Sequence, residues 1–283
     1  MEKITGVKMK TTRLGFDQSG INNAQSILFL HGGGGSSWSW QPVIHLLQNS
    51  FHCIAVDLPE HGRSKSITPF SMDLAADEVA ALIEAQAHGG QAVVVGLSEG
   101  AQVGVALLAR HPHLVTHAVL SGALLRPLAG SRMMTPALLR WSYNWFVKPF
   151  RNTDWYIRWN MRASVGIPAE YFEQFKADFQ LITAEGWTNL MLANQAFRLP
   201  GGLDKVQARV LALAGEQEYG VMHVSARDLA AAVPAGQAGL VRLPGSASLA
   251  QSHNWPLNAP ELCAMVIRAW VLGLDLPAEV WRL

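Results

Sequence analysis

The chain has 283 residues, of which 49% are hydrophobic and 15% charged, and its formal net charge is +1. This size and apolar content suffice for a substantial core in one or two domains, and the balanced charge gives no indication of nucleic-acid binding. Cys53 and Cys263 lie in apolar stretches and fit buried free thiols. We therefore expect no disulfide framework, no metal site and no cofactor.

The N-terminal segment is polar and lacks the apolar stretch of a secretory signal. No apolar run elsewhere approaches the roughly 18 residues that a membrane span needs. The expectation is a cytoplasmic protein without stable membrane insertion.

Short apolar runs alternate with helical patterns in the first part of the chain. Residues 4–17 fit short extended segments broken at Gly15. Buried strands are predicted at 26–30, 51–57, 91–95 and 116–121, with helices at 73–86 and from Ala101 to a stop at Pro112. This alternation is typical of βαβ units with a parallel sheet, and right-handed crossovers place helices on both of its faces.

The alternation stops between residues 125 and 203, where long helical patterns are rich in tryptophan. It resumes with a strand at 208–214, a helix near 224–233, a strand at 239–243 and a last helix at about 261–272. The sequence therefore predicts an α/β core made of residues 1–124 and 204–283, with a helical cap inserted at 125–203.

The segment Gly96–Gly100 (GLSEG) matches the pattern G-x-S-x-G and lies directly between a predicted strand and a predicted helix. That context is typical of a nucleophile elbow, in which a sharp turn exposes the serine. We predict that Ser98 is a catalytic nucleophile. A serine hydroxyl is a weak nucleophile, so it requires a positioned base.

His253 lies in the loop after the last predicted strand, which is where such a base is expected. The base in turn needs an acid that fixes its tautomer and stabilises its protonated form. Glu216 and Glu218 both lie in the turn after the strand at 208–214. We favour Glu218 because it lies further along the turn and is better placed to face the site, and Glu216 stays open as the alternative.

A tetrahedral intermediate needs preorganised N–H donors for its oxyanion. The backbone N–H of Glu99 follows the nucleophile at a helix N-terminus and is one candidate. The glycines after His31 provide the other, because glycine lets backbone approach a substrate closely. Gly33 is the preferred donor and Gly34 the next, whereas His31 fits a scaffold role.

Together these segments resemble the α/β-hydrolase superfamily, in the branch that carries a helical cap. Residues 31–40 (HGGGGSSWSW) are similar to its oxyanion loop, and residues 57–64 (DLPEHGRS) to its D-x-P-G-H-G-x-S segment. Residues 96–100, 215–218 (GEQE) and 252–262 (SHNWPLNAPEL) resemble its elbow, acid turn and histidine loop. The resemblance implies a doubly wound, mostly parallel sheet of about eight strands and a Ser-His-acid triad.

Three residues depart from the pattern of this superfamily. Glu218 stands where aspartate is usual, and Glu60 replaces a glycine in what we expect to be a surface turn. Glu99 places a carboxylate beside the nucleophile, where it favours the helix dipole but would oppose a developing oxyanion. We therefore expect the Glu99 side chain to point away from the site.

Tryptophans near the oxyanion loop and in the predicted cap are candidates for an apolar pocket, and we name Trp38, Trp141 and Trp145 together with Gly34. The first part of the cap is also basic. A solvated face, a site for an anionic substrate tail and a membrane surface all fit this pattern. The basic residues are Arg126, Arg132, Arg140, Lys148, Arg151, Arg158 and Arg162.

Because relatives in this superfamily that act on carbon–halogen bonds or epoxides carry aspartate at the elbow, Ser98 indicates acyl transfer to water. The predicted function is hydrolysis of a small to medium apolar carboxylic ester through an acyl-enzyme. A C–C bond hydrolase for ring-cleavage products and a thioesterase stay open, as does a ligand-binding homologue without turnover. The expected partner is a small-molecule substrate, and the sequence leaves monomer and dimer open.

Overall fold

A computed structural model describes residues 12–128, 130 and 133–283, so most of the extended region expected at 4–17 lies outside the described residues. One eight-stranded sheet has the order β1-β3-β2-β4-β5-β6-β7-β8. The six central strands run parallel, and the edge strands β1 and β8 are antiparallel to their neighbours. The predicted α/β fold with a mostly parallel sheet is confirmed.

The strands are β1 (Phe16–Ser19), β2 (Ser26–Leu30), β3 (His52–Val56), β4 (Ala92–Leu97), β5 (Val115–Ser121), β6 (Arg209–Gly215), β7 (Gly236–Val241) and β8 (Val280–Arg282). The α-helices are α1 (Gln41–Leu47), α2 (Met72–Gln86), α3 (Glu99–Arg110), α4 (Pro136–Ser142), α5 (Asp154–Trp159), α6 (Phe172–Leu181), α7 (Ala184–Ala196), α8 (Gly220–Ala232), α9 (Leu249–His253), α10 (Trp255–Asn258) and α11 (Pro260–Leu272).

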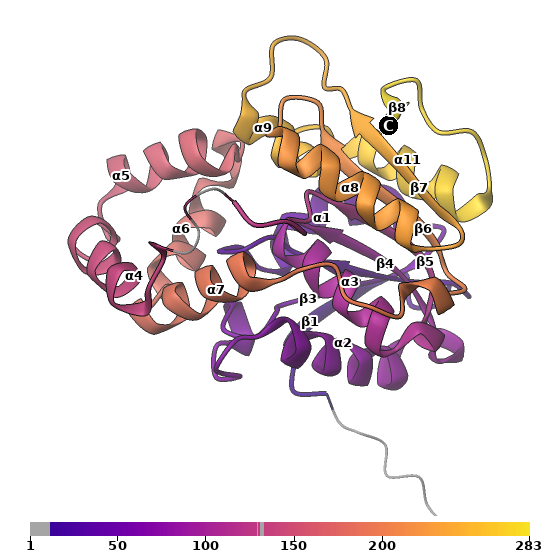
Figure 1. Cartoon of the computed structure of the whole chain (residues 1–283), viewed down its shortest axis with the longest axis horizontal. Helices are drawn as coiled ribbons and strands as arrows, with labels where there is room; N and C mark the ends of the chain where they lie inside the picture. Colours follow the sequence, from indigo (N-terminus) through magenta and orange to yellow (C-terminus); the bar gives the residue numbers. More distant parts are fainter. Residues whose placement is uncertain (1–11, 129, 131–132) are drawn as a thin grey trace, which may run out of the picture.

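Helices cover both faces of the sheet, with α2, α3 and α8 on one face and α1 and α11 on the other (Figure 1). Strand β2 shows why, since all five of its residues are buried. Leu28 and Leu30 pack into one core, and Ile27 and Phe29 into the other. Because successive strand residues point to opposite faces, a continuous apolar run needs cover on both sides.

Helices α4 to α7 lie between β5 and β6 in the chain and beside the sheet in space (Figure 1). They have a small apolar core of their own, in which Ile157, Met161 and Phe175 are buried together with Leu257 of α10. The bounds 125–203 of the predicted cap stay a prediction, and we call residues 125–203 the helical segment. No helix in the described part of the chain combines the length and hydropathy of a membrane span.

Two strands differ from the expectation. β7 begins at Gly236, three residues before the predicted start, and the short strand β8 was not predicted. Gly236 and Gln237 pair with Val210 and Leu211 of β6. Small and polar residues of this kind give no apolar signal, so the sheet partner rather than the local sequence determines where β7 begins.

Candidate active site

Ser98 occupies a strained turn between β4 and α3. Its φ of 55° and ψ of −115° are rare for a residue with a side chain. The glycines around it are required by close packing. A Cβ atom on Gly96 would lie 2.6 Å from the carbonyl oxygen of Gly100, and one on Gly100 would lie 2.3 Å from that of Leu30. The GLSEG pattern is therefore the packing solution for a sharp strand-to-helix turn.

His253 and Glu218 form a hydrogen-bonded pair. The imidazole Nδ1 donates to Glu218 Oε2 at 2.8 Å, and the other carboxylate oxygen accepts the backbone N–H of Gly215 at 2.7 Å. The Glu218 side chain is buried, whereas His253 is partly exposed at the end of α9. Glu216 turns the other way, and both its oxygens lie 3.0 Å from Nε of Arg242.

Ser98 and His253 line the same small cavity of about 70 Å³. The Ser98 N–H donates to the carbonyl of Ser121 at 2.8 Å, and a Cβ atom on the next residue, Gly122, would lie 2.8 Å from Cε1 of His253. In the described part of the chain no hydrogen bond joins the Ser98 hydroxyl to His253. Such contacts are often long without substrate and tighten when it binds.

The predicted oxyanion donors lie beside Ser98. A Cβ atom on Gly32 would lie 3.5 Å from Cβ of Ser98, which places the glycine loop against the nucleophile. The Gly34 N–H donates to Nε2 of His61 at 3.1 Å, so this N–H already has an acceptor and is not available to an oxyanion. The N–H groups of Gly33 and Glu99 have no acceptor among the described residues. This difference favours Gly33 over Gly34 as a donor.

Two buried histidines hold the glycine loop in place. His31 donates from Nδ1 to the carbonyl of Gly32 at 2.8 Å and accepts the N–H of Leu58 at Nε2, 3.0 Å away. Burial and the neighbouring His61 lower the pKa of His31 to about 3. Two hydrogen bonds to backbone groups of two different loops fit the scaffold role expected of His31.

The helical segment contacts the glycine loop through Asp178 of α6. Its Oδ2 accepts hydrogen bonds from Ser36 Oγ at 2.8 Å and from Trp38 Nε1 at 2.6 Å. Burial raises the pKa of the Asp178 carboxyl to about 6. No motif singled out Asp178, because its partners are 140 or more residues away in the chain.

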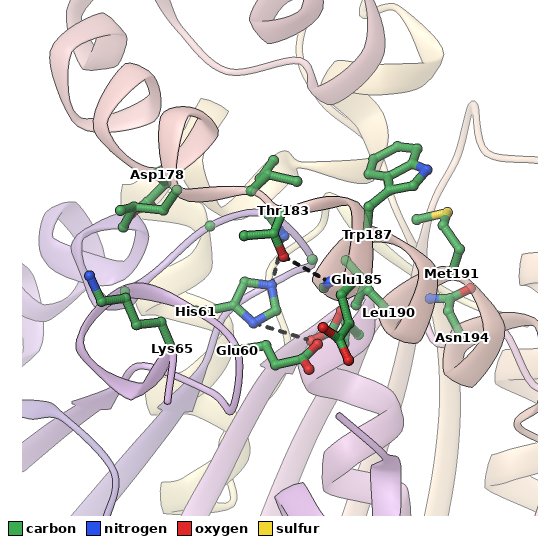
Figure 2. Close-up of a pocket in the computed structure, with 18 of the residues that line it drawn as sticks. Glu60, His61, Lys65, Asp178, Thr183, Glu185, Trp187, Leu190, Met191 and Asn194 are labelled. Carbon is green, nitrogen blue, oxygen red and sulfur yellow. Dashed lines mark hydrogen bonds and ion pairs between the residues drawn. The ribbon is translucent and has the colours of Figure 1, made fainter. Parts of the chain in front are cut away.

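Ser98 also lines a larger cavity of about 440 Å³, and Figure 2 shows residues from its wall. Gly33, Gly34, Ser98 and the side chain of Glu99 all line it. The expectation that Glu99 points away is therefore wrong. Its side chain is 1% exposed, and a Cβ atom on Gly33 would lie 2.9 Å from Glu99 Oε2. The glycine leaves space for the carboxyl group, which turns toward the loop instead of solvent.

The four predicted pocket residues separate into two groups. Gly34 lines both cavities, and Trp38 lines the smaller one together with Ser98 and His253. Trp141 and Trp145 line neither, and they are 51% and 65% exposed. Their prediction as pocket residues is corrected, because an apolar helical pattern does not distinguish an inward face from an exposed one.

The basic residues of the helical segment also lie away from these cavities. Arg140, Lys148, Arg158 and Arg162 are exposed and line neither cavity, so they form no site for an anionic tail there. Arg126 forms an ion pair with Asp228. Arg151 donates to Tyr143 Oη and to a backbone carbonyl, and Arg132 lies outside the described residues.

No group of three or more His, Cys, Asp or Glu side chains placed to hold a metal ion is found in the described ranges. Burial raises the pKa of the Cys53 thiol to about 12, and Cys263 is buried as well. Both cysteines are therefore the buried free thiols that the sequence predicted, and burial of this kind makes a thiol unreactive.

Comparison with known proteins places the chain among hydrolases of one fold. A family profile described as alpha/beta hydrolase fold matches residues 25–235. An AB hydrolase superfamily protein of Gibberella zeae is 27% identical over 270 residues, which are 93% of this chain and 85% of that protein.

Solved structures show the same architecture. An enol-lactonase from Burkholderia xenovorans superposes with a TM-score of 0.70 at 18% identity, over 94% of this chain and 99% of that one. A thermophilic esterase from Thermogutta terrifontis superposes with a TM-score of 0.69 at 19% identity, over 92% and 93%. At these identities the likeness shows the fold alone.

Proposed function

The chain belongs to the α/β-hydrolase family, and we propose that it is a serine hydrolase that cleaves a small to medium carboxylic ester through an acyl-enzyme. The observation that carries the proposal is the arrangement around Ser98. Ser98, in its strained turn, lines the same cavity as His253, and Nδ1 of His253 is hydrogen-bonded to the buried carboxylate of Glu218. This is the order of groups that activates a serine hydroxyl.

In the proposed reaction, Ser98 Oγ attacks the ester carbonyl carbon while its proton passes to Nε2 of His253. Glu218 stabilises the imidazolium through the bond to Nδ1, and the N–H groups of Gly33 and Glu99 receive the oxyanion. The protonated His253 then gives its proton to the departing alkoxide, which leaves as the alcohol. A water molecule, deprotonated by His253, then attacks the carbonyl carbon of the acyl-enzyme. The imidazolium returns this proton to Ser98 Oγ as the ester bond breaks and the carboxylic acid is released.

The larger cavity supports a substrate of limited size. Its volume of about 440 Å³ lies in the range of small-molecule sites, and it reaches Ser98 directly. Ile182, Leu190 and Met191 contribute apolar side chains to its wall. These residues suit the apolar part of an ester.

The proposal is tested with a substrate panel measured on the wild-type protein and on Ser98→Ala. The panel contains short p-nitrophenyl esters, acyl thioesters and vinylogous diketones that report C–C cleavage. We expect turnover of the esters by the wild type, with the variant reduced to background. Preferred turnover of thioesters or diketones would identify one of the alternatives, and an inert wild type would favour a ligand-binding homologue.

A further inference from the structure

The Glu99 carboxyl group is buried in the wall of the larger cavity without a partner. Its side chain is 1% exposed, and neither oxygen has a hydrogen-bond partner within the described part of the protein. A buried carboxyl group without such bonds is costly, so a partner outside the chain is the simplest way to satisfy it. The group faces the cavity that also contains Ser98.

His61 cannot supply the missing bond. Its Nδ1 lies 3.9 Å from Glu99 Oε1 and instead donates to the carbonyl of Pro59 at 2.9 Å. Its Nε2 accepts the N–H of Gly34, and burial lowers the pKa of His61. With one nitrogen donating and the other accepting, the ring is neutral and has no further proton to offer Glu99.

Glu60 adds a third unsatisfied carboxyl oxygen to the same wall (Figure 2). Its Oε1 accepts from Thr68 Oγ1 and from Asn189 Nδ2, whereas its buried Oε2 has no partner among the described residues. Burial and the charge of Glu60 raise the pKa of Glu99 well above its usual range. The two carboxyl groups are therefore close enough to repel each other when both are ionised.

The ionisable residues of the cavity also favour a cationic ligand. Among its described lining residues, Asp178 and Glu185 add two further carboxyl groups, and Lys65 is the one lysine or arginine. The amide oxygen of Gln195 is also buried without a hydrogen-bond partner in the described part of the chain. Among the described lining residues, Trp187 Nε1 is the single buried side-chain donor that lacks an acceptor. The wall therefore has more unpartnered side-chain acceptors than donors, and more carboxyl groups than basic side chains.

From this geometry we infer that the cavity binds a substrate that carries a primary ammonium group, held by Glu99 and Glu60 beside the nucleophile. An ammonium group supplies three donors to the unsatisfied oxygens and removes the repulsion between the carboxylates. It also compensates the charge that Glu99 carries once it is ionised, which would otherwise oppose the oxyanion at the neighbouring N–H groups. The inference rests on the proposed function, because it treats this cavity as the substrate pocket.

Calorimetric binding of hexylammonium, 1-hexanol and hexanoate tests the inference without requiring turnover. We expect the wild type to bind hexylammonium about tenfold more tightly than 1-hexanol, and hexanoate most weakly. Glu99→Gln should lose most of this preference and keep its affinity for 1-hexanol. Glu173→Gln, which removes an exposed carboxylate of α6 outside the cavity lining, is the matched control and should bind like the wild type.

Equal affinity of the wild type for hexylammonium and 1-hexanol would overturn the inference, as would an unchanged preference in Glu99→Gln. If Glu99→Gln does not fold, Glu60→Gln is measured instead, and it too should lose most of the preference for hexylammonium over 1-hexanol. The two proposals fail separately. A protein that selects hexylammonium but cleaves no ester contradicts the proposed function alone, and one that cleaves neutral esters without selecting the amine contradicts this inference alone.

Discussion

Glu218 holds His253 through a 2.8 Å hydrogen bond from the imidazole Nδ1, and its second oxygen is held by the Gly215 N–H. The extra methylene of glutamate is thus absorbed by a tight turn, since the Glu218 N–H also donates to the carbonyl of Gly215 at 3.1 Å. With Nδ1 carrying a proton, Nε2 is the acceptor that a nucleophilic serine requires.

Replacement of Glu218 by glutamine should reduce kcat strongly while leaving the fold intact. An amide can donate to Nδ1 and stabilise the wrong tautomer, and such changes cost about 10³- to 10⁴-fold in related triads. Glu216→Gln is the matched control, because its carboxylate pairs with Arg242 at the surface. Initial rates on a short p-nitrophenyl ester measure both, and similar losses in the two variants would reject Glu218 as the acid.

The backbone strain at Ser98 should limit the stability of the protein. Ser98→Gly removes the Cβ atom at a φ of 55°, so the free energy of unfolding should rise by about 1 kcal/mol or more. Ser98→Ala keeps the Cβ atom and should stay near the wild type in stability, although both variants lose activity. Chemical denaturation gives the comparison, and equal stability of the two variants would show that the turn is unstrained.

The glycine after the nucleophile turn should tolerate no side chain. In Gly100→Ala the new Cβ atom would meet backbone carbonyl groups, 2.3 Å from Leu30 O and 2.6 Å from His31 O. Destabilisation by about 2 kcal/mol or more is expected even though alanine favours helices. Gly220→Ala at the start of α8 meets nothing within 4 Å and serves as the control. If the thermal melting curves of Gly100→Ala and Gly220→Ala coincide, the predicted steric clash at Gly100 is wrong.

Asp178 should make the stability of the protein depend on pH. Its pKa of about 6 in the folded state lies above the ordinary value of 3.8, so the folded state holds the proton more tightly. The resulting stabilisation is fully present below about pH 4 and is lost as the pH rises through 6. Asp178→Asn should flatten this part of the stability curve between pH 4 and 8. A wild-type curve with the same slope as the variant would exclude Asp178 as its source.

The sequence was sufficient to predict the parts of the site that depend on local chain geometry. The elbow at Ser98 follows from a strand, two glycines and a helix that are adjacent in sequence, and the buried strands follow from continuous apolar runs. The competition between Glu216 and Glu218 could not be decided locally. It depends on Arg242 and His253, which approach the turn from later parts of the chain.

Side-chain direction was the main feature that sequence patterns could not provide. The expectation for Glu99 assumed that a carboxylate avoids an oxyanion site, yet the space left by Gly33 and the packing of α3 turn it inward. Trp141 and Trp145 were predicted to line a pocket for their apolar character alone, whereas the tertiary contacts of the helical segment leave them exposed. Local pattern identifies residue types that can form a site, and packing selects which of them do.

The most direct test of the account is covalent labelling with a fluorophosphonate, which reacts only with an activated serine. Mass spectrometry of the digested wild-type protein should place a single adduct on Ser98. Labelling should be absent in Ser98→Ala and at least about a hundredfold slower in His253→Ala, because the imidazole removes the proton of the hydroxyl. A wild type that stays unlabelled, or one labelled as fast without His253, would contradict the claim that these two residues act together.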